Sequence, residues 1–160
     1  MTARSTCHGT FVVERRLAAS PARVFAAFAT PEGKDQWFAC HGGSTREIRE
    51  MDFREGGHER VRGVGPEGIS DFRALYHDIV PYQRIVYSYE MFNNEARISV
   101  SITTIVITPE GKGARLQLTE QGVFMDHDPD GPMGPASREH GTNALMDQLA
   151  AALAREHAQA

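Results

Sequence analysis

The stretch ASREHGTNALMDQLAAALAREH, residues 136–157, is the part of the sequence that decides the fold. It contains no proline, and Gly141 is its only glycine. Apolar side chains recur along it at helical spacing, namely Leu145, Met146, Leu149, Ala152 and Leu153. Such a period is typical of a helix that buries one face. We therefore predict a long amphipathic helix over residues 136–157, which needs an apolar surface to cover its buried face.

That surface is predicted to be a β-sheet. Between Cys40 and Phe124, β-branched and aromatic residues alternate with polar ones, most clearly in IVYSYEMF (85–92) and RISVSITTIVI (97–107). Glycine, proline and asparagine mark the turns, as at Asn93-Asn94. Six strands fit between the turns, near residues 45–52, 57–64, 69–80, 83–92, 96–108 and 114–124. Short turns between consecutive strands favour an antiparallel meander.

The first forty residues predict one more strand and two short helices. Residues 10–17 (TFVVERRL) alternate like a half-buried strand. Ser20-Pro21 combines a capping side chain with proline at the first helical position, which predicts a helix over residues 21–29. Thr30-Pro31-Glu32 repeats this signal and begins a second short helix that is expected to reach Trp37-Phe38.

The order strand, two helices, six strands and helix predicts one α+β domain over residues 1–160, with an ordered core of about residues 10–157. The 160 residues can bury a sizeable core. Apolar residues make up 41% and charged residues 24%, as in ordinary globular proteins. Such a core needs neither a metal nor a disulfide to fold, and no cofactor is predicted.

The charge and hydropathy of the sequence indicate which classes of partner are not expected. The formal net charge of −4 comes from 21 acidic and 17 basic residues without a basic block, so no nucleic-acid partner is expected. No stretch approaches the roughly eighteen apolar residues of a membrane span, and Met1 to Gly9 lacks the apolar run of a secretion signal. We therefore expect a cytoplasmic protein. Cys7, in an N-terminus expected to be frayed, and Cys40, in a loop, suit reduced thiols.

Five segments carry a family resemblance when taken in order. They are AASPARVFAAFATPEGKDQWF (18–38), FREGGHERVR (53–62), IVPYQRIVYSY (79–89), GKGARLQLTEQG (111–122) and EHGTNALMDQLAAAL (139–153). Together they resemble the activator-of-heat-shock-ATPase-like branch of the START-related (SRPBCC) superfamily. The resemblance covers the chain from about Phe11 to Leu153.

The resemblance implies a helix-grip fold, in which a curved antiparallel sheet of about seven strands wraps around the long helix. It also implies an internal cavity for lipids, sterols, polyketides or other apolar molecules. The co-chaperone that names the branch stimulates a chaperone ATPase, but one fold hosts many functions. The chain has Gly141-Thr142 where the family has Gly-Trp, which removes a large aromatic side chain from one side of the implied cavity. A roomier or more polar cavity is expected there.

Glu120 is the candidate polar residue of this cavity. In residues 114–124, Glu120 shares a strand face with the apolar residues Leu116, Leu118 and Phe124, and this face should point to the helix. A buried carboxylate must find a partner or stay protonated through a raised pKa. Glu120 is therefore expected to orient a polar group of the ligand or to act as an acid or base. The alternative is that it pairs with an arginine or lies at the wet mouth.

The candidate ligand-binding set consists mainly of aromatic side chains on inward strand faces or near the cavity mouth. Its members are Trp37, Phe72, Tyr76, Tyr87, Tyr89 and Phe124, together with Glu120 and the helix residues Leu145 and Leu149. Aromatic walls with a few polar groups are typical of small-molecule pockets. The alternative for each of these residues is a place in the ordinary core.

Other motifs give no site. Asp126, Asp128, Asp130 and Gly131 reproduce the first half of a calcium loop, but its twelfth position is Ser137 instead of glutamate. Cys40-His41 has no orienting third residue for a nucleophile–base pair. The histidines are scattered without helical zinc-site spacing. No metal site and no catalytic residue are predicted.

Three functions are left open by these observations. The first is an intracellular module that binds a small hydrophobic molecule between sheet and helix, in a cavity of several hundred cubic ångströms. The second is an enzyme acting on a hydrophobic, polyketide-like substrate with Glu120 as acid or base. The third is a modulator of a chaperone ATPase. The absence of a catalytic motif favours the first, and the ligand and the oligomeric state, a homodimer included, stay open.

Overall fold

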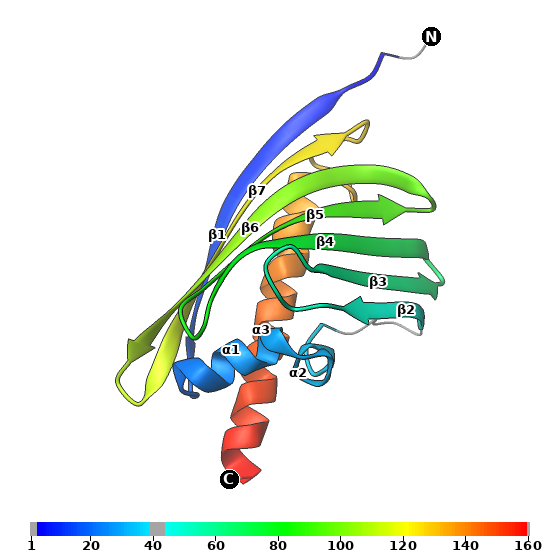
Figure 1. The fold of residues 1–160 in the computed structure, drawn as a ribbon. Coiled ribbons are helices and arrows are strands. Elements are labelled where there is room, and N and C mark those ends of the chain that lie inside the picture. Colours follow the sequence, from blue (N-terminus) through cyan, green and yellow to red (C-terminus); the bar gives the residue numbers. More distant parts are fainter. Residues whose placement is uncertain (1–2, 39–43, 160) are drawn as a thin grey trace.

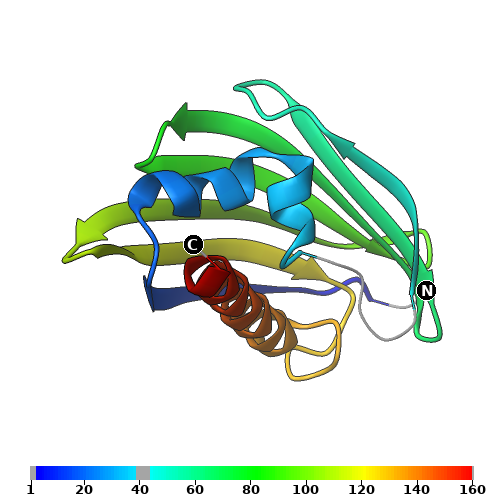
Figure 2. The same ribbon diagram turned by 90° about the horizontal axis from the view of Figure 1, so that it is seen from below.

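The computed structural model describes residues 3–38 and 44–159. Its seven strands form one antiparallel sheet in the order β1-β7-β6-β5-β4-β3-β2. The sheet is curved, and the helices lie on its concave side (Figures 1 and 2). The elements in chain order are β1 (Thr6–Leu17), α1 (Pro21–Ala29), α2 (Pro31–Asp35), β2 (Thr45–Met51), β3 (His58–Gly65), β4 (Gly68–Val80), β5 (Arg84–Asn93), β6 (Ala96–Glu110), β7 (Gly113–Met125) and α3 (Pro135–Gln159).

The first strand begins earlier than predicted. β1 starts at Thr6 because β7 continues to Met125 and offers its main chain to residues 6–9 as well. The frayed N-terminus expected around Cys7 is therefore wrong, since Cys7 lies opposite Phe124 in this pair of strands. Its side chain is a free thiol, as the sequence suggested.

The predicted capping residues start both short helices. The Ser20 side chain accepts a hydrogen bond from Arg23 N at 3.3 Å, and Thr30 Oγ1 accepts one from Gly33 N at 3.0 Å. These bonds satisfy backbone donors that have no partner inside the helix. The bounds predicted for α1 are confirmed. α2 is shorter than predicted and ends at Asp35, so that Trp37 and Phe38 lie in the turn after it.

The β5–β6 hairpin turns one residue later than predicted. Its two central residues are Asn94 and Glu95, with φ of 47° and 69°, while Asn93 pairs with Ala96. Positive φ at both positions matches the right-handed twist of the two strands. Asn94 Oδ1 also accepts a hydrogen bond from Ile69 N at 2.9 Å, which ties this turn to the start of β4.

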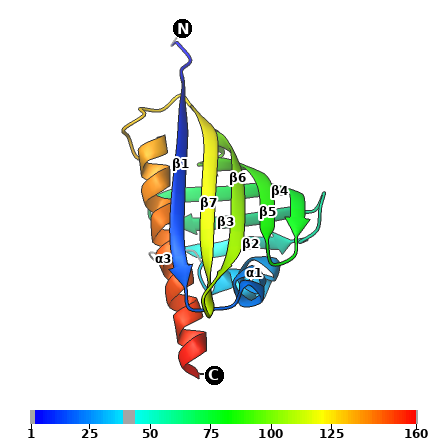
Figure 3. The same ribbon diagram turned by 90° about the vertical axis from the view of Figure 1, so that its left-hand side faces the viewer.

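α3 packs along β1 and covers that half of the concave face (Figure 3). Its buried side chains, Thr142, Met146, Leu149, Ala152 and Leu153, recur at helical spacing. They meet the inward faces of the strands and the apolar side of α1, where the main core lies. Among the helices described, none is long and apolar enough to cross a bilayer. The amphipathic helix predicted from the sequence is thus confirmed, and it packs on the concave face of the sheet.

Candidate functional site

A cavity of about 320 Å³ lies between strands β4 to β7 and the first half of α3. Trp37 and Phe38, which follow α2, contribute to one side of its lining, and the loop residues Pro132 and Met133 before α3 contribute to another. The sheet contributes mainly aromatic and aliphatic side chains, and α3 contributes Arg138, Thr142 and Leu145. Most of the lining is apolar, as is typical of pockets for small molecules.

The structure brings most of the predicted ligand-binding set together around this cavity. Its lining includes Trp37, Phe72, Tyr87, Tyr89, Glu120 and Leu145. They meet because inward positions of neighbouring strands are adjacent, as Phe72 of β4 is to Tyr89 of β5, with ring centroids 4.9 Å apart. Tyr87 and Leu145 are only half-buried because part of each borders the cavity.

Three predicted members do not line the cavity. Tyr76 lies deeper, with its ring against Phe53 at a centroid distance of 5.0 Å. Phe124 is buried beneath the guanidinium of Arg138, which lies 5.1 Å from its ring centroid. Leu149 lies one turn of α3 beyond Leu145 and packs in the main core. These residues face inward as predicted, but an inward face does not tell whether a side chain borders a cavity or fills the core.

Glu120 lies at the polar end of the cavity. Its Oε1 accepts hydrogen bonds from Tyr89 Oη at 2.9 Å and from Thr103 Oγ1 at 3.1 Å. Its Oε2 is buried and has no hydrogen-bond partner among the described residues, while Arg138 lies 4.0 Å away as an ion-pair partner. Burial raises the pKa of Glu120, and Arg138 together with the two hydrogen bonds opposes this rise. The inward position predicted for Glu120 is confirmed, and so is its pairing with an arginine.

Arg138, in the first turn of α3, is the site residue that the sequence analysis missed. Its Nη1 donates to Tyr89 Oη at 2.8 Å and its Nη2 donates to Ser99 Oγ at 2.8 Å. Its guanidinium also lies 5.5 Å from the ring centroid of Tyr89. The signal was present in the sequence, because residue 138 falls on the same helical face as Thr142, Leu145 and Leu149.

Thr142 occupies the place where the family resemblance implied tryptophan. It lies on α3, where its side chain is buried and lines the cavity beside Gly141. A Cβ atom added to Gly141 would meet nothing within 4 Å. Gly141 itself is exposed, so this open space borders solvent, and the expectation of a roomier cavity beside Thr142 stays a prediction.

A second buried polar cluster lies behind the aromatic wall. Lys34 Nζ donates to Glu59 Oε1 at 2.8 Å, and the two side chains are 3% and 1% exposed. Tyr76 Oη donates to the same oxygen at 2.6 Å, and Arg49 Nη1 donates to Glu59 Oε2 at 2.9 Å. Burial alone would raise the pKa of Glu59, but these three groups outweigh it and hold the pKa below its ordinary value. Every polar atom of Glu59 is thereby satisfied, so we assign this cluster to folding and not to ligand binding.

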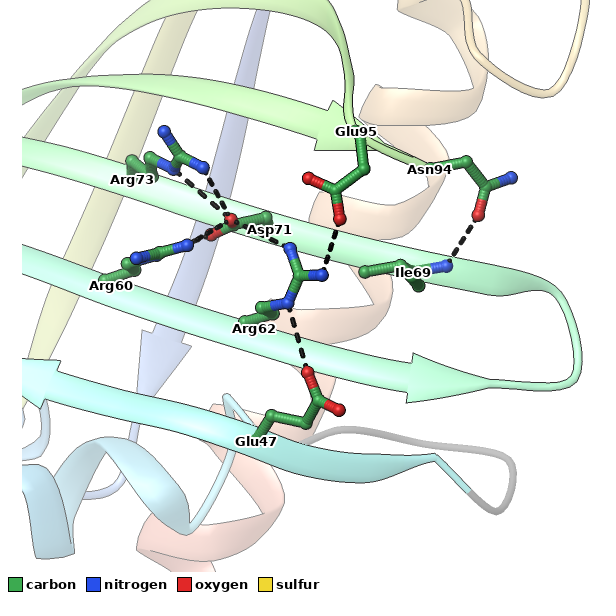
Figure 4. Close-up of polar contacts among 8 residues, drawn as sticks. All are labelled: Glu47, Arg60, Arg62, Ile69, Asp71, Arg73, Asn94 and Glu95. Atoms are coloured by element: carbon green, nitrogen blue, oxygen red, sulfur yellow. Dashed lines mark hydrogen bonds and ion pairs between the residues drawn. The ribbon is translucent and has the colours of Figure 1, made fainter.

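A third cluster lies on the convex face of the sheet, around Asp71 (Figure 4). Arg60, Arg62 and Arg73 all donate to its carboxylate, with Arg60 Nη2 and Arg73 Nη2 at 2.8 and 2.9 Å from Oδ2. Arg62 also pairs with Glu47 of β2 and with Glu95 of the β5–β6 turn. The cluster thus links the three neighbouring strands β2, β3 and β4 and the β5–β6 turn by balanced charges, which is a structural role.

This cluster predicts an acid-dependent loss of stability. Burial alone would raise the pKa of Asp71, but the hydrogen bonds from Arg60 and Arg73 lower it from 3.8 to about 2. A lowered pKa stabilises the fold above about pH 4, and this contribution is lost as the pH falls towards about 2. We expect Asp71→Asn to cost about 2 kcal/mol at pH 7 and to flatten this part of the acid profile. Urea unfolding at several pH values measures both effects. The control is Asp52→Asn, because Asp52 is exposed. If the stability of Asp71→Asn falls with pH as steeply as that of the wild type, the assignment is contradicted.

The remaining motifs that lie within the described residues form no site. Asp126 Oδ1 accepts a hydrogen bond from Ser5 N and so ties the end of β7 to the residue before β1, whereas Asp128 Oδ1 accepts one from Asp130 N within a local turn. Within residues 3–38 and 44–159, no group of three or more His, Cys, Asp or Glu side chains is placed to hold a metal ion. Cys40 and His41 lie outside the described residues.

The sequence of the chain is similar to that of a known protein family. The sequence profile of the family described as Activator of Hsp90 ATPase homolog 1-like protein matches residues 18–154. The chain belongs to this family. The family is part of the SRPBCC superfamily, so the resemblance found in the sequence is confirmed, and with it the helix-grip fold. This fold generally binds hydrophobic ligands.

Solved structures of family relatives agree with this assignment. The chain is 44% identical to an uncharacterised protein from Rhizobium leguminosarum, over 96% of this chain and 99% of that chain, with a TM-score of 0.87. It is 40% identical to Mll3558 from Rhizobium loti, over 92% and 99% of the two chains, with a TM-score of 0.78. The protein CV1439 from Chromobacterium violaceum is 27% identical over 90% and 96%, with a TM-score of 0.74. No match was found among the curated proteins.

Proposed function

We propose that this protein is a binding module for a small hydrophobic molecule, which it encloses between its curved sheet and α3. The observation that carries the proposal is the cavity of about 320 Å³, whose volume is in the range of small-molecule sites. The apolar side chains of its wall have no protein packing partners on the side that faces the cavity. A ligand that fills the cavity would supply such partners.

The chemistry of the wall supports an aromatic or branched apolar ligand. Phe72, Tyr87 and Tyr89 present ring faces and edges, and Met91 and Leu145 add flexible aliphatic surface. Such rings bury a large area at a small cost in side-chain entropy, because they are already held in place by neighbouring rings. These residues, with Trp37 and Glu120, are our proposed ligand-binding residues.

We place the complex in the cytoplasm, as the sequence predicts. The free thiol of Cys7 suits a reducing compartment of this kind.

Filling the cavity from the protein side should abolish binding. Thr142 lines the cavity, so Thr142→Trp should place an indole in the space that the ligand needs. We expect the affinity for the neutral probe N-phenyl-1-naphthylamine to fall at least about tenfold, because the apolar contact area of the probe is lost. Probe fluorescence measures the affinity, and thermal unfolding followed by circular dichroism shows whether the variant keeps its fold.

The control for this experiment is Thr142→Val, which keeps the volume of the side chain and should bind the probe nearly as the wild type does. Equal affinity of the wild type and the folded Thr142→Trp variant would contradict the proposed site. A wild-type protein that does not bind the probe would count against the proposed function itself.

A further inference from the structure

The wall of the cavity contains one hydrogen-bond acceptor that the protein leaves unused. Glu120 is 4% exposed and lines the cavity, and its Oε2 has no hydrogen-bond partner among the described residues. A buried carboxylate oxygen without a donor costs free energy, more so than a neutral group. A ligand that brings a donor to this atom would therefore gain more than the same ligand without one.

The hydrogen bonds of the neighbouring donors go to atoms other than Oε2. Tyr89 and Thr103 both donate to Oε1 of Glu120, not to Oε2. Arg138 donates to Tyr89 Oη and Ser99 Oγ, and the guanidinium is held between the rings of Tyr89 and Phe124. Arg138 therefore stays 4.0 Å from Oε2, where it stabilises the negative charge without forming a hydrogen bond.

The charge of this pair also discriminates between ligands. Arg138 and Glu120 place one guanidinium beside one carboxyl group at the polar end of the cavity. An anionic ligand would bring a second negative charge against a buried carboxylate, and burying like charges together is unfavourable. A neutral molecule with a donor meets no such penalty.

We infer that the cavity selects neutral apolar molecules that carry a hydroxyl group, and that this hydroxyl donates its hydrogen bond to Glu120 Oε2. The inference rests on the proposed function and deepens it by naming the chemical class of the ligand. Glu120 is the residue that sets this specificity. The apolar body of the ligand lies against Phe72, Tyr89 and Leu145, which line the rest of the cavity.

Three probes of matched shape test the inference on the wild-type protein: 2-naphthol, 2-methoxynaphthalene and 2-naphthoate. Isothermal titration calorimetry at neutral pH gives their affinities. We expect 2-naphthol to bind about tenfold more tightly than 2-methoxynaphthalene, which cannot donate, since a hydrogen bond to a charged group contributes about that factor. 2-Naphthoate should bind more weakly than 2-naphthol because of its charge.

Glu120→Gln tests the same contact from the protein side. With its carbonyl oxygen still accepting from Tyr89 and Thr103, the variant places an NH₂ donor where Oε2 was. The preference for 2-naphthol over 2-methoxynaphthalene should then disappear or reverse. The matched control is Glu90→Gln on the opposite face of the sheet, where Glu90 pairs with Arg97, and this variant should keep the wild-type preference.

The outcomes separate the two proposals. Equal binding of 2-naphthol and 2-methoxynaphthalene by the wild type would overturn the inference. Tightest binding of 2-naphthoate would overturn it as well. In both cases the proposed function would still stand, because the probes bind. Failure of all three probes to bind counts against both. The comparison of the three probes needs only wild-type protein, so it decides the question even if Glu120→Gln does not fold.

Discussion

Replacing Lys34 by methionine is expected to lower the free energy of unfolding by about 3–5 kcal/mol. Lys34 Nζ lies 2.8 Å from Glu59 Oε1, with both side chains almost fully buried. Methionine keeps most of the volume but removes the positive charge, and Glu59 is then left in the interior with less compensation. The pKa of Glu59, now held below its ordinary value mainly by Lys34, should rise. Urea unfolding at pH 7 measures the loss of stability.

A double variant shows that the loss comes from the buried carboxylate that has lost its lysine. Lys34→Met combined with Glu59→Met removes both charges, while Arg49 keeps Asp35 as a partner at 3.0 Å. This double variant should be more stable than Lys34→Met alone, because no carboxylate stays buried without its lysine. Arg115→Met, which breaks an exposed ion pair with Glu14, should change stability little. A loss as small in Lys34→Met as in Arg115→Met would contradict the assignment.

Leu149→Ala is expected to cost about 3 kcal/mol of stability and to leave ligand affinity unchanged. Leu149 is fully buried in the main core between α3 and the sheet, and it does not line the cavity. Removing its side chain leaves a hole in close-packed surroundings, while the ligand contacts stay as they are. Urea unfolding gives the stability, and titration with N-phenyl-1-naphthylamine gives the affinity of the folded protein.

Leu145→Ala, one helical turn earlier, is the matched control for this experiment. Leu145 is half-buried beside the cavity, so its removal should cost less stability and weaken probe binding several-fold. We therefore expect Leu149→Ala to lower mainly the stability and Leu145→Ala to lower mainly the affinity for the probe. A weakened affinity in Leu149→Ala with an unchanged one in Leu145→Ala would show that the ligand lies elsewhere along α3.

The sequence was sufficient for the fold because its local signals agree with one another. Proline after a capping hydroxyl places α1 within the residues predicted, and the period of α3 identifies the face that packs on the sheet. The strand ends were predicted less well, since pairing between main chains does not depend on the side chains. β1 therefore begins at Thr6, ahead of the alternating pattern that starts near residue 10.

The site could be predicted only in part from the sequence. Alternation along β7 identified Glu120 as an inward carboxylate, but it could not supply the partners of Glu120 from β5, β6 and α3. The same alternation in β3 places Glu59 beside Val61 on the inward face, and this signal was not used. Lys34 gave no such signal, because its burial depends on how the five residues of α2 pack against the sheet.

Whether an inward side chain lines the cavity or packs in the core depends on the curvature of the sheet. The local sequence pattern of a strand does not predict this curvature. Tyr76 and Phe72 lie on the same face of β4, yet Phe72 borders the cavity and Tyr76 packs in the core. The difference comes from α1 and Phe53, which pack over one end of the concave face, while the start of α3 and the residues beside it leave a cavity at the other end.

A crystal structure of the protein with N-phenyl-1-naphthylamine would locate the bound probe. We expect electron density for the two ring systems between Phe72 and Leu145, with the amine nitrogen within hydrogen-bond distance of Glu120 Oε2. Density for the probe on the convex face, or side chains of the protein filling the space between sheet and α3, would contradict the proposed site.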